Sequence, residues 1–189
     1  MPVFEYVASI YSIVLALSAA NTLSALAHVI KHRRTVQGYW VHTAWCVSFL
    51  IMHLALWRGI WFTTGGWDEL TIFQMLPYFQ WVVFWYVASR LLAPDSEGSG
   101  VINLAEYYFT IKTPFLVCVY LPYVINVAWV SLLDPTALDL SLPILSTMLA
   151  MWGAAALGIW SSDRRVHGAV VIFCFVAQVV QEWLQGSIN

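Results

Sequence analysis

Six long apolar runs, separated by short polar joints, constrain this chain more than any other feature. They lie at residues 7–30, 39–62, 70–92, 108–132, 140–160 and 166–184. A helix needs about 20 mainly apolar residues to cross the hydrocarbon core of a bilayer. Only 10% of the 189 residues are charged, whereas a soluble domain has about a quarter. The sequence therefore predicts an all-α polytopic membrane protein, a bundle of six transmembrane helices.

The joints between the runs are too short to hold a separate soluble domain, so residues 1–189 are expected to form one transmembrane helical domain. The longest joint, 93–107, contains Pro94, Asp95 and Gly98 and is expected to be an exposed loop. The first run has no basic residue before it and no small-residue cleavage site after it. We therefore interpret it as a membrane span rather than a signal peptide.

Lysine and arginine residues predict how the chain is threaded through the membrane. Seven of the eight border alternate joints: Lys31, Arg33, Arg34, Arg90, Lys112, Arg164 and Arg165. The positive-inside rule places such joints in the cytoplasm. The opposite joints contain four acidic residues and no basic one: Asp68, Glu69, Asp134 and Asp139. We therefore expect a multi-pass protein of the bacterial inner membrane with both termini on the outer, periplasmic side.

The run 39–62 combines a membrane-spanning length with polar side chains. Six residues at helical spacing are expected to share one face: His42, Trp45, Cys46, Phe49, His53 and Trp57. Ionisable groups inside hydrocarbon are costly and normally face other helices or a cavity. His53 stands alone near mid-membrane, where it either donates a hydrogen bond to a neighbour or relays protons.

Two further features predict contacts between the runs. Arg58 is expected to pair with Glu5 or Glu182 at the outer end, or to attract anions there. In the first run, a stripe that includes Ser18, Asn21 and Ala25 predicts a packing seam against the second run, with a substrate-lining surface as the alternative.

Histidines near the inner side of the membrane raise the alternative of a cofactor. His28, His42 and His167 are expected at similar depth, with Cys46 one turn deeper. Imidazole and thiolate groups ligate transition metals, and two histidines on facing helices can hold a haem. The alternative is that these histidines lie among lipid headgroups and bind nothing. The three cysteines show no disulfide or zinc spacing.

Several phrases run in the same order through nearly the whole chain: EYVASIYSIVLALS, YWVHTAW, MHLALWRGIW, YVASRLLAPD, LAEYYF and RRVHGAVV. Together they resemble a widespread group of bacterial integral membrane proteins that has no assigned activity. The resemblance implies a six-span fold and an inner-membrane location. It implies no substrate and no catalytic residue.

The sequence leaves three kinds of function open. A structural or accessory subunit, surrounded by membrane lipids and assembled with itself or with other membrane subunits, is the first expectation. A small transporter or channel would use a polar pathway past Asn21, His53 and Arg58, and a redox protein would hold haem b or a metal. No nucleophile elbow, phosphate loop or HExxH motif favours an enzyme. The net charge of −2 gives no reason to expect nucleic-acid binding.

Overall fold

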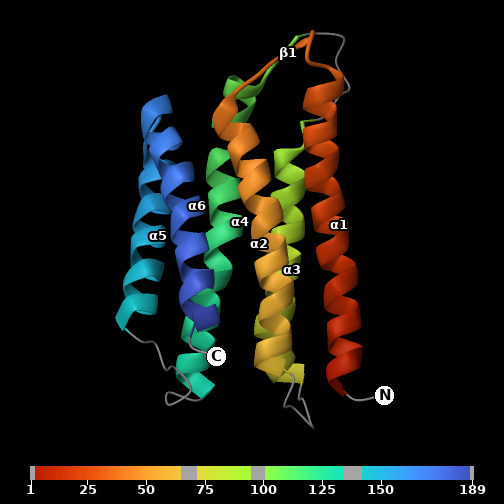
Figure 1. The fold of residues 1–189 in the computed structure, drawn as a ribbon, viewed down its shortest axis with the longest axis vertical. Helices are drawn as coiled ribbons and strands as arrows, with labels where there is room; N and C mark the ends of the chain where they lie inside the picture. The colour runs from red at the N-terminus through yellow and green to blue at the C-terminus, as the bar shows by residue number, and fades with distance from the viewer. Residues whose placement is uncertain (1–2, 65–71, 95–100, 134–141, 188–189) are drawn as a thin grey trace.

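The computed structural model describes residues 3–64, 72–94, 101–133 and 142–187. Within these ranges the chain forms six helices and two short strands: α1 (Val3–Lys31), β1 (Val36–Gln37), α2 (Trp40–Thr64), α3 (Ile72–Leu92), β2 (Ile102–Asn103), α4 (Leu104–Leu133), α5 (Leu142–Trp160) and α6 (Arg164–Ser187). The helices stand side by side, with the two ends of the chain at one end of the bundle and β1 at the other (Figure 1). The predicted all-helical class is confirmed.

Within the described residues, four helices contain a stretch that is long and apolar enough to cross a membrane. The four stretches are Glu5–Lys31, Trp40–Gly59, Leu104–Trp129 and Arg164–Trp183. In α5 the apolar stretch is shorter, Leu145–Trp160. Large apolar side chains that face outward include Leu54, Leu132 and Leu157, which are 70%, 82% and 53% exposed. Apolar patches this extensive are rare on soluble monomers and suit a lipid environment.

The six helices form a closed ring. Neighbours pack in the order α1, α2, α6, α5, α4 and α3, and α3 packs back against α1. Aromatic side chains fill the space where α2, α3 and α4 meet. The ring centroid of Phe115 lies 5.3 Å from that of Trp45 and 6.0 Å from that of Phe49, and the Phe49 and Trp85 centroids are 4.9 Å apart. These four side chains are at most 1% exposed, so they pack tightly in the region where the three helices meet.

The polar face expected in the second run is buried along most of its length. His42, Trp45, Cys46 and Phe49 are 0% exposed, and His53 is 4% exposed. Trp57, near the end of α2, is 46% exposed, and its indole N–H donates to Ser12 Oγ of α1 at 3.2 Å. Exposed tryptophans lie towards both ends of the bundle: Trp40 and Trp160 near β1, and Trp57 and Trp183 at the opposite end. Aromatic belts of this kind are typical of membrane interfaces.

The joint 93–107 is only partly the exposed loop that we expected. β2 pairs in parallel with β1, with Val36 opposite Ile102 and Gln37 opposite Asn103. The side-chain Oδ1 of Asn103 then accepts hydrogen bonds from the backbone N–H groups of residues 105 and 106, at 3.1 and 3.4 Å. This N-cap starts α4 at residue 104 instead of the expected 108, and it places Leu104 in the core with no exposed surface.

Six basic residues gather at the β1 end of the bundle, in or next to the joints there: Lys31, Arg33, Arg34, Arg90, Arg164 and Arg165. Lys112 lies inside α4 and is only 9% exposed. Its ammonium reaches the joint between α5 and α6 at the same end of the bundle, where it donates to Ser161 O. The acidic joint residues Asp68, Glu69, Asp134 and Asp139 lie outside the described residues.

Candidate functional site

A cluster of small polar groups links α1, α2 and α3 near the middle of the bundle. This mid-bundle cluster comprises Ser18, Asn21, His53, Ser89 and the backbone carbonyl of Trp85. Ser18 Oγ lies 2.7 Å from His53 Nε2 and 3.0 Å from Trp85 O. One turn along α1, the Asn21 amide donates to Ser89 Oγ at 3.2 Å. The stripe predicted on the first run therefore packs on α3 as well as on α2, because its polar members bond to both helices.

His53 is the most polar member of this cluster. Its Nδ1 lies 2.5 Å from the carbonyl oxygen of Phe49 in the preceding turn of α2. Its ring packs against the rings of Phe49 and Trp85, with centroids 4.6 and 5.4 Å away. Both ring nitrogens of this buried histidine thus have protein partners, and one of them lies on another helix.

A second polar group, which we call the α5-end cluster, surrounds the C-terminal end of α5. The last four carbonyls of a helix lack partners within the helix. Here Leu157 O accepts from Ser161 N at 2.9 Å. The Lys112 ammonium, reaching across from α4, donates to Gly158 O at 3.2 Å, to Ile159 O at 2.8 Å and to Ser161 O. A buried cation thereby completes the end of a neighbouring helix, where the helix dipole favours positive charge.

The α5-end cluster continues through three side chains from three helices. The Trp45 indole N–H donates to the Tyr108 oxygen at 3.1 Å, and the Tyr108 hydroxyl lies 2.9 Å from His167 Nδ1. His167 Nε2 lies 3.1 Å from Ser161 O. A carbonyl only accepts, so Nε2 has the proton and Nδ1 accepts from Tyr108. These bonds join α2, α4 and α6 to the end of α5.

The end of α3 is completed in the same manner. His42 Nε2 lies 2.9 Å from Leu92 O. The Tyr107 hydroxyl donates towards Leu91 O at 2.7 Å and Ala93 O at 3.0 Å. Both buried helix ends at the β1 side are thus capped by side chains from neighbouring helices. This explains why a histidine and a tyrosine occupy apolar segments there.

The histidines and cysteine predicted as metal or haem ligands have separate environments. His42 and His167 cap helix ends, and Cys46 is a fully buried thiol. His28 is half-buried and packs on His32, with ring centroids 4.4 Å apart. Among the described residues, no group of three or more His, Cys, Asp or Glu side chains is arranged to hold a metal ion.

Arg58 and Glu182 form an ion pair between α2 and α6, with 2.9 Å between Nη2 and Oε2. The Gln178 amide donates to the other carboxylate oxygen at 3.3 Å. The side chains of Arg58 and Glu182 are 42% and 28% exposed. Glu5, the other partner predicted for Arg58, has an exposed side chain on α1. Arg58 thus lies at the edge of the bundle, on a different part of α2 from the mid-bundle cluster.

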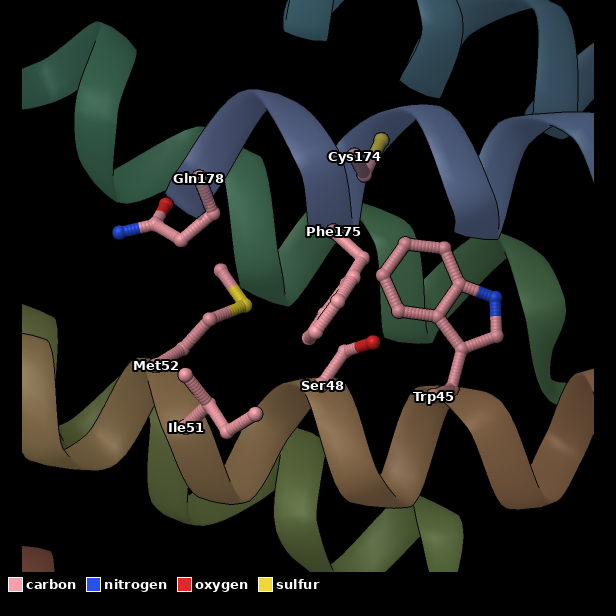
Figure 2. A pocket seen from close by; sticks show the side chains of 7 residues that line it. All are labelled: Trp45, Ser48, Ile51, Met52, Cys174, Phe175 and Gln178. Carbon is pink, nitrogen blue, oxygen red and sulfur yellow. The ribbon is translucent and has the colours of Figure 1, made fainter. Parts of the chain in front are cut away.

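A small cavity lies between α2 and α6 (Figure 2). Its lining residues are Trp45, Ser48, Ile51 and Met52 from α2, and Cys174, Phe175 and Gln178 from α6. Its volume of about 10 Å³ is close to the minimum for one water molecule. It is therefore too small for a haem or for an organic substrate.

Sequence reasoning missed the two residues that organise the α5-end cluster, Lys112 and Tyr108. A signal for Lys112 was present: it is the only lysine inside the predicted run 108–132, and an intramembrane cation calls for a partner. No local signal marked Tyr108, because its partners lie 63 and 59 residues away in the sequence.

No protein-family model matches this chain, and comparisons with curated proteins and with solved structures gave no match.

Proposed function

We propose that this chain is a six-span inner-membrane protein that serves as a structural or accessory component of a membrane assembly. The observation that supports this function best is the use of the buried polar side chains. Lys112, His42 and His167 bond to the ends of neighbouring helices, and His53 bonds to α1. Such bonds join the helices to one another, as expected of a structural component.

The packing of the bundle favours the same function. Aromatic rings fill the place where α2, α3 and α4 meet, and the cavity between α2 and α6 has room for about one water molecule. The outward faces of the helices are apolar on many sides, as suits lipid or other membrane subunits. The cavity between α2 and α6, which is formed by described residues, is too small for a haem or for a solute larger than about one water molecule.

The proposed topology has both termini outside and the β1 end in the cytoplasm. The gathering of six basic residues at that end supports it. Single cysteines introduced at Arg34 and Arg165 in a Cys118→Ser background should react with a membrane-impermeant maleimide only after cell lysis. A cysteine at Glu5 should react in intact cells. Labelling of Arg34→Cys and Arg165→Cys from opposite sides would contradict six spans.

Purification in a mild detergent, followed by native mass spectrometry and absorption spectroscopy, tests the accessory role. We expect a homo-oligomer or a complex with other membrane subunits, colourless and without metal. The same sample in liposomes should show no solute or ion flux above that of empty liposomes. A monomer with saturable flux would indicate a transporter, and a Soret band would indicate a haem protein; either result overturns the proposal.

A further inference from the structure

When the imidazole of His53 is neutral, His53 and Ser18 together have two hydrogens to donate, whereas their three contacts need three. His53 Nδ1 faces the carbonyl of Phe49 at 2.5 Å, so Nδ1 must have a hydrogen. A neutral imidazole then has a bare Nε2 that needs a donor, and Ser18 Oγ lies 2.7 Å from it. The same hydroxyl lies 3.0 Å from the Trp85 carbonyl, which also needs a donor for this contact. One hydroxyl hydrogen thus faces two acceptors.

Adding one proton to Nε2 removes the mismatch. The imidazolium then donates from Nδ1 to Phe49 O and from Nε2 to Ser18 Oγ, and the Ser18 hydroxyl donates to Trp85 O. Three donors now serve three contacts, and they form a continuous chain from α2 through α1 to α3. The proton comes from a hydronium ion, so one O–H bond of that ion breaks as the new N–H bond forms, and a water molecule is left.

His167 offers an internal comparison. Its Nε2–H donates to Ser161 O, and its bare Nδ1 accepts from the Tyr108 hydroxyl, whose oxygen accepts from the Trp45 indole. Every contact is satisfied with a neutral ring. An added proton on Nδ1 would point at the hydrogen of the Tyr108 hydroxyl, and the hydrogen bond that Tyr108 donates to His167 would be lost.

We propose that His53 is a proton-binding site in the middle of the bundle, whose protonation turns the Ser18 hydroxyl from the imidazole to the Trp85 carbonyl. In the neutral form the hydroxyl links α1 to α2 alone. In the protonated form Ser18 links α2 to α3 through α1. Proton uptake therefore strengthens the contact between α1 and α3. This inference goes beyond the accessory role and holds whether the protein acts alone or in an assembly.

The surroundings of His53 contribute hydrogen-bond acceptors but no charge in direct contact. Its ring bonds to Ser18 Oγ and packs against the rings of Phe49 and Trp85. Arg58, five residues further along α2, is paired with Glu182. Among the described residues, the other titratable groups of the packed helices in this half of the bundle are Glu5, Tyr6 and Tyr11 of α1, Tyr78 and Tyr86 of α3, Cys118, Tyr120 and Tyr123 of α4, and Cys174 of α6. His42 and Cys46 precede His53 on its own face of α2.

Nitrogen NMR of protein labelled with ¹⁵N-histidine in lipid nanodiscs tests the proposal, because bare and protonated imidazole nitrogens resonate well apart. His53→Gln and His167→Gln variants assign the signals. Between about pH 8 and pH 4, we expect the bare Nε2 signal of His53 to be replaced by a protonated one. The bare Nδ1 signal of His167 should persist over the same range. Persistence of a bare Nε2 in His53 down to pH 4, in protein that stays folded by tryptophan fluorescence, would overturn the proposal.

Variants of the serine test its part in the switch. Ser18→Ala removes the acceptor of the Nε2 proton, so the protonated signal should be lost from this pH range. Ser18→Thr retains a hydroxyl and should restore it. Ser9→Ala, also on α1 but exposed and bonded to the Glu5 carbonyl of its own helix, is the matched control and should titrate like the parent protein. Equal titration of all three variants would overturn the role of Ser18. If Ser18→Ala fails to fold, the proposal is tested by the parent protein alone, in which the bare nitrogen signal of His53 should titrate and that of His167 should not.

Discussion

Replacing Lys112 with methionine removes an ammonium group from the end of α5 while keeping an unbranched apolar side chain in its place. The change deletes three donated hydrogen bonds, to Gly158 O, Ile159 O and Ser161 O. Ser161 O keeps its bond from His167 Nε2, whereas the other two carbonyls belong to the last turn of α5 and lose their side-chain donor. The helix end then lies buried without a cap.

The size of the effect follows from these three bonds. Interhelical hydrogen bonds in a membrane protein average about 0.6 kcal/mol and reach about 1.7 kcal/mol. Three of them therefore amount to about 2–5 kcal/mol. Methionine recovers part of this, because the ammonium no longer has to be held away from water. We expect Lys112→Met to lower the free energy of unfolding by about 2–3 kcal/mol.

Reversible unfolding with SDS in mixed micelles, followed by tryptophan fluorescence, measures this loss. Lys31→Met is the matched control, since Lys31 is exposed in the last turn of α1, and it should change the free energy of unfolding by no more than about 0.5 kcal/mol. If the two variants were equally stable, the Lys112 ammonium would not cap α5 and the assignment of the α5-end cluster would be wrong.

Two other substitutions and one control test the hydrogen bonds and the packing around the same cluster. Tyr108→Phe removes the hydroxyl that bonds to Trp45 and His167, so it should lower the free energy of unfolding by about 1–3 kcal/mol in the same assay. A loss below about 0.5 kcal/mol would contradict these two hydrogen bonds. Gly158→Ala would place a methyl group 2.9 Å from Leu116 Cδ1 in the core, so it should destabilise the protein by about 1–3 kcal/mol. Gly153→Ala meets nothing within 4 Å and should be neutral or slightly stabilising; similar losses in the two alanine variants would refute the close approach of α5.

The helices and the buried face of α2 could be predicted because both depend on local patterns. The length and apolarity of the runs predict helices whatever their partners are. The spacing of His42, Cys46 and His53 predicts a shared face, and ionisable groups in hydrocarbon turn inward. Neither the helices nor the buried face depends on which helices become neighbours.

The partners of the polar groups could not be predicted, because they depend on contacts between distant segments. Lys112 bonds to carbonyls 46 to 49 residues away, and His42 bonds to one 50 residues away. Carbonyls at helix ends exist in every helix, so the sequence does not tell which side chain will reach them. The start of α4 is a different case: Asn103 followed by Glu106 is a recognisable N-terminal signal, but the apolar run begins later and placed the boundary at residue 108.

The strand pair at the basic end has a consequence for how the chain is made. Val36 and Ile102 lie 66 residues apart, so β1 is synthesised well before its partner strand. The pairing of β1 with β2 can therefore form only once the start of α4 has emerged. A nascent chain arrested before Ile102 would keep the segment between α1 and α2 untethered, and a protease on that side of the membrane would cut it there more readily than in the finished protein.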